Sequence, residues 1–288
     1  MTIQLGIIGF PIGHSLSPVF QQAALDHLKL DAIYSTWEID QRDLGAFIDG
    51  LRSPDIKGIN VTVPHKEAVL PLLDHVDEWA LQAGAVNTIV NRGGALYGYN
   101  TDGMGFIKGL RHNAPFELHN KTVLIIGAGG SARGVVRALA NESVGNIIIA
   151  NRTLSRAQSL STLSIGLGVP AQAISLDWQE LSLASVQSEL IVNCTSVGMA
   201  HTSEFGLSPL LLQQISPNSV VYDLVYNPIE TQLLKEAVRA GAAVISGIKM
   251  LVYQGAASFE LWFDRPAPVD VMLESADKAI QNMAESPD

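Results

Sequence analysis

This chain of 288 residues has a single cysteine, few aromatic residues and no long hydrophobic run. Because Cys194 has no second cysteine to pair with, an intrachain disulfide is excluded, and we expect a packed, inert thiol in a reducing cytoplasm. No apolar stretch has the length that spans a bilayer. Residues 1–13 lack a basic leader and contain glycine and proline, so we expect no signal peptide.

Positive charge is also scarce, with 18 lysine and arginine residues against 28 aspartate and glutamate residues. The formal net charge of −10 argues against a nucleic-acid or anionic-membrane surface, but it permits a local positive pocket for a small anion. No cluster of His, Cys or Asp has metal-ligand spacing, so we predict no metal. The length and the hydrophobic share of 47% predict two globular domains.

The stretch 122–137 is the clearest signal for function. An apolar run, 123–126, is followed by glycines and then by a small-residue helix pattern. A buried strand, a glycine turn and a helix form the geometry that binds a dinucleotide, since the helix N-terminus offers N–H groups to phosphates. The alternative is a glycine-rich turn that binds nothing. The residues of this turn that we expect to contact the cofactor are Gly127, Ala128, Gly129, Gly130 and Ser131.

The end of the next strand indicates which dinucleotide is bound. An NAD-binding domain usually has an acidic residue here to hold the ribose hydroxyl, yet residues 151–153 contain none. Arg152 and Arg156 are present instead, and a guanidinium can pair with a 2′-phosphate. We therefore predict NADP(H), with two solvated arginines as the alternative.

From residue 122 onward strand and helix patterns alternate, which predicts a parallel sheet covered on both faces. The expected strands are 123–126, 147–150, 189–193, 219–224 and 243–246, with a possible strand at 169–174. The expected helices are 131–141, 153–163, 208–214 and 229–240. We expect the domain boundary near Gly103, with residues 104–112 as a linking helix.

The first hundred residues contain polar groups near predicted strand ends. Strands are expected at 3–8, 33–39 and 58–63, and helices from Ser17 and at 43–51. Ser17 before Pro18 predicts a helix N-cap, whereas Ser15 has no capping duty and faces the end of the sheet.

Asn60, Thr62 and Lys66 are expected to converge at one strand end. If Pro64 opens a helix, Lys66 lies where the helix dipole disfavours a cation, which favours a functional role over a solvated lysine. Asp102 fits a helix N-cap and a functional carboxylate equally well.

Two helices are expected after the second sheet, one beginning after Gly247 and one over 269–283, with a frayed tail at 284–288. Gln254 lies among apolar residues of the first of these helices and needs a hydrogen-bonding partner if it is buried.

Taken in order, the motifs of this chain resemble those of shikimate dehydrogenases over nearly the whole length. The matching segments are His14-Ser15-Leu16-Ser17-Pro18, Asn60-Val61-Thr62-Val63-Pro64-His65-Lys66, Gly84-Ala85-Val86-Asn87-Thr88, Gly98-Tyr99-Asn100-Thr101-Asp102-Gly103, Gly127-Ala128-Gly129-Gly130, Asn151-Arg152-Thr153 and Gln254-Gly255-Ala256. One departure is Gln21-Gln22, where many members have His-Asn, and we expect it to alter helix packing rather than chemistry.

The resemblance implies NADP-dependent interconversion of 3-dehydroshikimate and shikimate, on the route to chorismate and the aromatic amino acids. It implies an α/β fold of two domains with the active site in the cleft between them. A substrate domain with a mostly parallel sheet would comprise 1–102 plus 248–288, and a Rossmann-type NADP domain would comprise 103–247.

The resemblance also implies roles for individual residues. Lys66 and Asp102 are expected to be catalytic. The expected substrate-binding residues are Ser15, Ser17, Asn60, Thr62, Asn87, Tyr226 and Gln254. The expected cofactor-binding residues, beyond those of the glycine turn, are Asn151, Arg152, Thr153, Arg156, Val225, Gly247 and Met250.

Two alternatives stay open at this point. One is a quinate/shikimate dehydrogenase of broader specificity, since one ring hydroxyl is a subtle distinction. The other is a non-catalytic NADP-binding regulator of the same fold. The sequence decides neither between monomer and homodimer nor whether Lys66 donates a proton or acts mainly as an electrostatic anchor.

Overall fold

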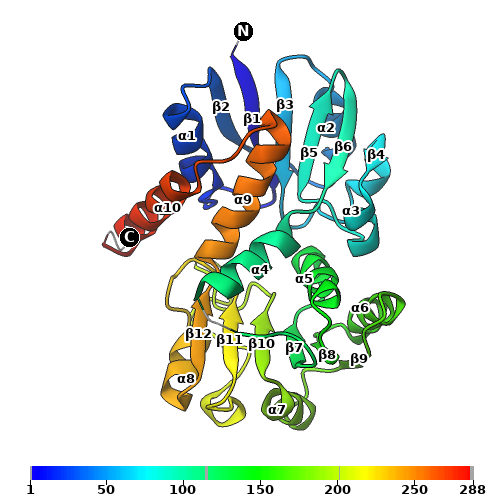
Figure 1. Ribbon diagram of the computed structural model, residues 1–288, viewed down its shortest axis with the longest axis vertical. Helices are drawn as coiled ribbons and strands as arrows, with labels where there is room; N and C mark the ends of the chain where they lie inside the picture. The colour runs from blue at the N-terminus through cyan, green and yellow to red at the C-terminus, as the bar shows by residue number, and fades with distance from the viewer. Residues whose placement is uncertain (1, 114–115, 201, 286–288) are drawn as a thin grey trace. The chain divides into compact units, whose positions relative to one another are not determined.

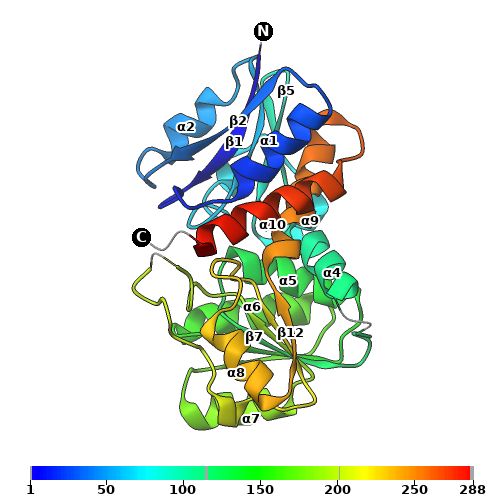
Figure 2. The same cartoon turned by 90° about the vertical axis from the view of Figure 1, so that its left-hand side faces the viewer.

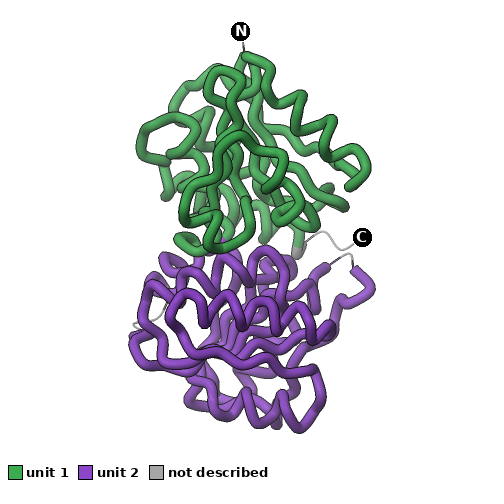
Figure 3. The backbone as a smooth tube through the Cα atoms, turned by 90° about the vertical axis from the view of Figure 1, so that its right-hand side faces the viewer, with its two compact units in different colours: residues 1–105, 251–288 green, residues 106–250 purple. Residues whose placement is uncertain are grey.

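A computed structural model describes residues 2–113, 116–200 and 202–285 of this chain. The chain divides into two compact units, which we call unit 1 (residues 1–105 and 251–288) and unit 2 (residues 106–250) (Figure 3). The divisions fall within α4 (Asp102–Asn113) and α9 (Ile248–Phe263). In the described part of the chain, no helix is both long and apolar enough to cross a membrane.

Unit 1 contains a six-stranded mixed sheet in the order β2-β1-β3-β5-β6-β4. Its strands are β1 (Ile3–Gly9), β2 (Ala32–Glu38), β3 (Ile56–Val61), β4 (His75–Val76), β5 (Thr88–Arg92) and β6 (Ala95–Tyr99). β1 pairs in parallel with β2 and β3, whereas β5 runs antiparallel to both of its neighbours. The carboxyl ends of β1 and β3 therefore meet at one edge, where ligands of such sheets commonly bind.

Helices cover both faces of this sheet. They are α1 (Ser17–His27), α2 (Leu44–Gly50), the 3₁₀ turn η1 (Leu70–Leu72), α3 (Glu78–Ala83), most of α9, and α10 (Val269–Glu285). Leu44 and Ile48 of α2 share a buried core with Ile8, Ile59 and Ile89 of the strands. Helices α1 and α10 lie side by side on the face opposite to α2 (Figure 2).

Unit 2 is a parallel, doubly wound sheet in the order β12-β11-β10-β7-β8-β9 (Figure 1). Its strands are β7 (Thr122–Ile126), β8 (Asn146–Ala150), β9 (Ala171–Ile174), β10 (Leu190–Asn193), β11 (Val220–Asp223) and β12 (Ala243–Ser246). The order reverses between β7 and β10, which is the switch point where dinucleotides bind in sheets of this topology. The five strands predicted at 123–126, 147–150, 189–193, 219–224 and 243–246 are all present, and residues 171–174 form a strand within the range 169–174.

The helices of unit 2 include α5 (Gly130–Asn141), α6 (Leu154–Gly166), α7 (Trp178–Gln187), the 3₁₀ turn η2 (Leu212–Gln214) and α8 (Gln232–Ala240). The predicted helix at 208–214 is wrong, because only its last residues form η2. Pro209 lacks an N–H, and the Ser208 hydroxyl donates to the Leu210 carbonyl, so the local bonds compete with a helix. Helix α7 was not predicted, since apolar Trp178 and Leu183 lie exposed and blur its period.

Two local predictions in unit 1 also need correction. Lys66 lies in an irregular turn rather than a helix, because its carbonyl accepts the N–H of Val86 and is lost to a helical ladder. The argument from the helix dipole therefore does not apply to Lys66. The N-cap of α1 is Leu16 and not the predicted Ser17. The Ser15 hydroxyl accepts the backbone N–H of Ser17 at 3.2 Å. At the other end of the chain α10 extends to Glu285, and residues 286–288 of the predicted frayed tail lie outside the described residues.

Candidate functional site

A buried ion pair lies at the centre of the polar residues of unit 1. Lys66 Nζ is 2.6 Å from Asp102 Oδ2, and the two side chains are 9% and 4% exposed. Asp102 is the first residue of α4, and its carboxylate accepts from Lys66 at Oδ2 and from Asn87 at Oδ1. Because the burial of two charges costs free energy, a buried ion pair contributes little to stability. Its presence therefore marks a candidate functional site.

Asn87 connects this ion pair to the helix α9. Its Nδ2 lies 2.9 Å from Asp102 Oδ1, 3.0 Å from Gln254 Oε1 and 2.8 Å from Thr101 Oγ1. The Thr101 backbone N–H donates to Asn87 Oδ1, which fixes the amide so that its donor side faces Asp102. We call Lys66, Asn87, Thr101, Asp102 and Gln254 the Asn87 cluster. The Nδ2 group of Asn87 has two protons for three acceptor oxygens, so at least one of these oxygens can accept a hydrogen bond from a ligand hydroxyl.

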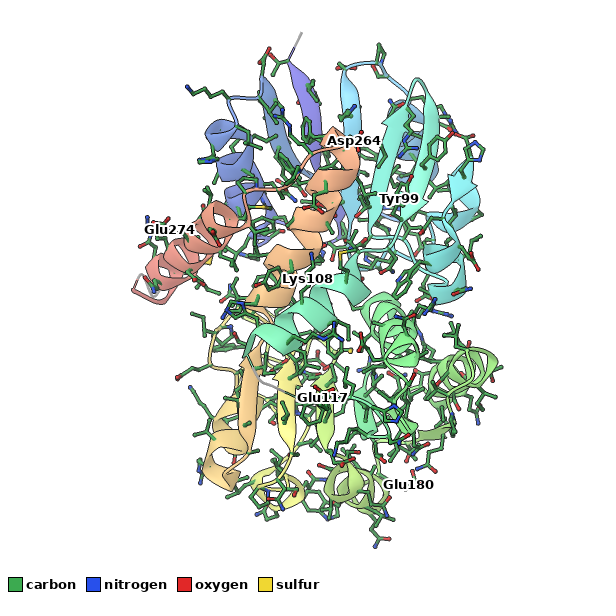
Figure 4. The ribbon with its side chains drawn as sticks, viewed as in Figure 1. Tyr99, Lys108, Glu117, Glu180, Asp264 and Glu274 are labelled. Carbon is green, nitrogen blue, oxygen red and sulfur yellow. The ribbon has the colours of Figure 1, made fainter. Side chains whose placement is uncertain are left out.

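A second layer of buried polar side chains holds the Asn87 cluster. Asn60 Nδ2 donates to Ser258 Oγ at 2.9 Å and to the Asn87 carbonyl at 3.1 Å, and Asn60 Oδ1 accepts the hydroxyl of Tyr34 at 2.7 Å. Ser258 is fully buried, and its hydroxyl also bonds to that of Thr88. Thr88 of β5 pairs with Tyr99 of the antiparallel strand β6 (Tyr99 is labelled in Figure 4). The polar atoms of Asn60 are thus used within the protein.

The remaining predicted substrate residues of unit 1 lie near the carboxyl ends of β1 and β3. The Thr62 N–H donates to the Ile8 carbonyl, which places Thr62 just beyond β3. Ser15 is half-buried, whereas Ser17 is buried and interacts with the Tyr34 hydroxyl. Burial raises the pKa of Tyr34 well above its usual value, so this phenol stays protonated and can donate its hydrogen bond.

In unit 2 the glycine turn lies at the switch point of the sheet. Gly127 has φ +106°, and a Cβ there would lie 2.9 Å from Thr195 Cγ2 and 3.1 Å from the Cys194 carbonyl carbon. Side chains larger than hydrogen are therefore excluded by both conformation and space. Cys194 itself is half-buried and follows β10 directly.

The N-terminus of α5 fits a phosphate group. Its N-cap is Gly129, which has no side chain to bond the first N–H groups, and a Cβ at Gly129 would meet nothing within 4 Å. Gly130 and Ser131 begin the helix and are half-buried, while Ala128 and Ala132 are buried beneath them. Open space above uncapped amides is the chemistry that a pyrophosphate requires.

The segment after β8 supplies positive charge next to this turn. Gly127 N–H donates to the Ala150 carbonyl, so the end of β8 adjoins the glycine turn. Asn151 Nδ2 donates to the Thr153 carbonyl at 2.9 Å and shapes the bend that follows the strand. Arg152, Thr153 and Arg156 are exposed. A donor set of guanidinium groups without a carboxylate fits a ribose 2′-phosphate better than a free diol.

The other predicted cofactor residues lie at the ends of β11 and β12. Val225 N–H donates to Asp223 Oδ1 at 3.0 Å, and a Cβ at Gly247 would collide with the backbone of Leu224. Met250 is buried. Tyr226 is half-buried and belongs to unit 2, whereas the other predicted substrate residues belong to unit 1. Among the residues with described side chains, no three His, Cys, Asp or Glu form a metal-binding group.

Comparison with known families matches three segments of the chain. Residues 7–89 match the shikimate dehydrogenase substrate binding domain, residues 110–204 match shikimate/quinate 5-dehydrogenase, and residues 247–276 match the shikimate 5′-dehydrogenase C-terminal domain. The shikimate dehydrogenase (NADP(+)) of Geobacillus kaustophilus is 41% identical over 276 residues, which cover 96% of this chain and 98% of that protein. That of Moorella thermoacetica is 45% identical over 273 residues, covering 93% and 90%.

Solved structures agree with these matches. Shikimate 5-dehydrogenase from Thermus thermophilus, in complex with NADP(H) and shikimate, superposes with a TM-score of 0.85 at 34% identity, covering 96% of this chain and 99% of that one. Quinate dehydrogenase from Corynebacterium glutamicum, in complex with NAD, has a TM-score of 0.86 at 30% identity, covering 96% and 99%.

The doubly wound unit 2 and the buried lysine–aspartate pair of unit 1 place the chain among the two-domain α/β dehydrogenases that use a nicotinamide dinucleotide. Within that class, the chain belongs to the shikimate dehydrogenase family.

Several polar residues of these two units were not predicted from sequence. In unit 1 they are Tyr34, Thr88 and Ser258, and in unit 2 they are Asn193, Asp223 and Thr231. A signal existed for Ser258, which follows Gln254 by one helical turn in an otherwise apolar stretch. Asp223 likewise ends a run of three apolar strand residues, 220–222.

Proposed function

We propose that this chain is a shikimate dehydrogenase, an oxidoreductase that reversibly reduces 3-dehydroshikimate to shikimate with NADPH. The observation that carries the proposal is the Lys66–Asp102 pair, buried and held at 2.6 Å in the unit that matches the substrate binding domain. The close relatives named as NADP(+)-dependent shikimate dehydrogenases support it. We propose unit 1 as the substrate domain and unit 2 as the NADP domain.

NADPH, when bound, supplies a hydride to the ring carbonyl carbon, whose C=O π electrons move onto the oxygen. Lys66 stabilises this developing negative charge with its ammonium group and donates the proton that completes the alcohol. Asp102 accepts a hydrogen bond from Lys66 and keeps its ammonium group aimed at the carbonyl oxygen. In the oxidation direction the unprotonated amine of Lys66 takes the proton from the alcohol as the hydride leaves.

The residues around the pair suit a ring that carries several hydroxyl groups and a carboxylate. Acceptor oxygens of Asp102 and Gln254 face Asn87, and ring hydroxyls can donate to them. The hydroxyls of Ser15 and Ser17 are the natural ligands of the carboxylate. For the cofactor, the α5 N-terminus would hold the pyrophosphate, and Arg152 with Arg156 would hold the 2′-phosphate.

The test is an assay of reduced-nicotinamide absorbance with the purified protein, crossing shikimate and quinate with NADP⁺ and NAD⁺. We expect a signal with shikimate and NADP⁺ that exceeds the other three combinations. Absence of any signal, with NADPH binding intact, contradicts the proposal and favours a regulator that kept the fold. The intact Lys66–Asp102 pair argues against that alternative.

A quinate/shikimate dehydrogenase of broader specificity is the second candidate. The structural likeness to a quinate dehydrogenase in complex with NAD supports it. The absence of an acidic residue at 151–153 argues against preference for NAD. A comparable signal with quinate or NAD⁺ in the same assay moves the chain to this class.

We further propose that the enzyme acts in the cytoplasm, since a lone cysteine fits a reducing compartment. We expect a small-molecule substrate only and no nucleic-acid partner, because the net charge is −10. A mass measurement in solution decides between monomer and homodimer.

A further inference from the structure

Asp223, the last residue of β11, is a buried carboxylate that the proposed reaction does not use. Its exposed fraction is 0%. Three donors converge on it: Asn193 Nδ2 at 2.9 Å and the Val225 N–H at 3.0 Å reach Oδ1, and the Thr231 hydroxyl reaches Oδ2 at 2.6 Å. No cation is among these donors. We call Asn193, Asp223 and Thr231 the Asp223 cluster.

Each side chain bound to Asp223 controls a loop of its own. Asn193 Oδ1 accepts the N–H and the hydroxyl of Thr195, at 3.0 and 2.6 Å, which shapes the loop 194–198 after β10. Thr231 is the N-cap of α8 and ends the loop 224–231 after β11. The carboxylate of Asp223 therefore ties two loops together at the carboxyl edge of the sheet.

These two loops adjoin the proposed cofactor-binding residues. Thr195 and Cys194 lie against Gly127, where even a Cβ would be too close. On the other side, Gly247 approaches the backbone of Leu224, and a Cβ there would lie 3.0 Å from the Asp223 carbonyl oxygen. A displacement of Asp223 would thus be felt both at the glycine turn and at Gly247.

The choice of a carboxylate here is costly. Burial raises the pKa of Asp223 to about 6, although the three hydrogen bonds act in the opposite direction. A neutral side chain could bond to the same two loops with a smaller desolvation cost. Such a costly buried group is usually retained where a binding site must be preorganised.

We propose that Asp223 is a positioning residue for the dinucleotide, fixing the loops 194–198 and 224–231 around the switch point. This inference rests on the proposed use of NADP(H). It places the main effect of Asp223 on cofactor affinity, since all the expected substrate-binding residues except Tyr226 belong to unit 1.

The test is a fluorescence titration of NADPH into Asp223→Ala, without substrate, followed by steady-state kinetics. Removing the carboxylate leaves three buried donors short of an acceptor, so we expect the dissociation constant of NADPH to rise about tenfold or more. The KM for shikimate, measured at saturating NADP⁺, should rise less than the dissociation constant of NADPH, because Tyr226 is the one expected substrate-binding residue in the loop 224–231.

Glu189→Ala is the matched control on the same sheet. The Glu189 carboxylate accepts from Lys121 Nζ at 2.7 Å and from the Thr122 N–H at 3.0 Å, and so ties β7 and β10 at their amino ends, at the opposite edge of the sheet from Asp223. We expect this variant to lower the melting temperature and to leave NADPH affinity unchanged. If it weakens NADPH as much as Asp223→Ala at an equal loss of melting temperature, the positioning role is wrong.

Two gentler variants keep the test decisive if Asp223→Ala does not fold. Asp223→Asn keeps an amide oxygen for Asn193 and Val225 but turns a donor toward Thr231, and Thr231→Val removes the same contact from the other side. We expect each to weaken NADPH severalfold. Unchanged affinity in both overturns the inference. Wild-type protein that binds NADPH but oxidises no shikimate contradicts the proposed function alone.

Discussion

The polar side chains of unit 1 bind one another, whereas the proposed cofactor-binding groups of unit 2 are largely backbone amides and exposed arginines. In unit 1, Lys66, Asn87 and Asp102 are all at least nine-tenths buried and share a continuous set of hydrogen bonds. In unit 2, the α5 N-terminus is uncapped, and Arg152 and Arg156 lie at the surface.

This difference fits the ligand that we propose for each unit. A small ring acid presents hydroxyls in fixed directions, so its partners must be oriented before it arrives, and a buried network does that. A dinucleotide presents diffuse negative charge over a long molecule, which helix termini and guanidinium groups attract with little demand on direction. We therefore expect mutations in unit 1 to act on turnover and mutations in unit 2 to act on cofactor affinity.

The largest effect should come from Lys66→Ala. Loss of the proton donor and of the positive charge at the carbonyl oxygen should lower kcat by about 10²–10⁴-fold. Binding of NADPH, measured by fluorescence, should be unchanged because Lys66 belongs to unit 1. Lys108→Ala, at an exposed lysine of α4 (labelled in Figure 4), is the control and should retain wild-type turnover. Equal turnover in both variants would remove Lys66 from the catalytic role.

The second effect tests unit 2 through Arg152→Ala. Loss of a charge-assisted hydrogen bond to the 2′-phosphate should raise the KM for NADP⁺ by about 10–150-fold, which corresponds to about 1.5–3 kcal/mol. The KM for NAD⁺, which lacks that phosphate, should stay nearly constant.

Arg42→Ala, at an arginine of unit 1 whose side chain is 86% exposed, is the control for Arg152→Ala. Arg42→Ala should change neither the KM for NADP⁺ nor the KM for NAD⁺. Parallel losses for NADP⁺ and NAD⁺ in Arg152→Ala would show that Arg152 does not read the phosphate.

The third effect concerns the support of unit 1, through Ser258→Ala. Its hydroxyl lies 2.9 Å from Asn60 Nδ2 and 2.7 Å from Thr88 Oγ1, so its loss should lower the free energy of unfolding by about 1–3 kcal/mol. The KM for shikimate should rise as Asn60 and Asn87 loosen. The Ser258 hydroxyl also donates to the Gln254 carbonyl, four residues earlier. Thr162→Ala removes the equivalent bond to the Gln158 carbonyl at an exposed position of α6 and should change stability by less than about 0.5 kcal/mol. Equal destabilisation by the two variants would contradict a special role for Ser258.

The smallest effect is a pH dependence of stability that belongs to unit 2. Because burial raises the pKa of Asp223 to about 6 from 3.8, the folded state holds this proton more tightly than the unfolded state. The group therefore favours folding at low pH, and that contribution is lost as pH rises through about 6. Its partners, Asn193, Thr231 and the backbone of Val225, do not titrate.

Chemical denaturation of wild type and Asp223→Asn at several pH values checks this. The difference in unfolding free energy between the two should change by about 1 kcal/mol between about pH 5 and about pH 7, in favour of wild type at the lower value. A constant difference would mean that Asp223 titrates near its ordinary value in the fold.

The strands of unit 2 could be predicted because each buried parallel strand is a short apolar run that ends at a glycine or polar residue, as β7 does at Gly127. The failures occurred where tertiary contacts override local pattern. Lys66 follows a proline that suggests a helix, but its carbonyl is taken by Val86, which is twenty residues away. No local rule contains that contact.

The candidate site residues show the same contrast between what a local sequence pattern predicts and what tertiary contacts decide. Lys66 and Asp102 could be singled out from motifs, yet their 2.6 Å contact depends on the packing of two segments 36 residues apart. Tyr34 was missed because apolar packing explains the pattern of its strand, and Ser258 was missed although its spacing from Gln254 is a signal. Their function as partners of Asn60 exists only in three dimensions.

The central claim is that Lys66 and Asp102 act as one catalytic unit, and a double-mutant cycle on kcat tests it most directly. Lys66→Ala, Asp102→Asn and the double variant are compared with wild type in shikimate oxidation at saturating NADP⁺. We predict strong non-additivity, with the double variant losing little more than Lys66→Ala alone. Fully additive losses in the logarithm of kcat would show that the two residues act independently and would contradict the account.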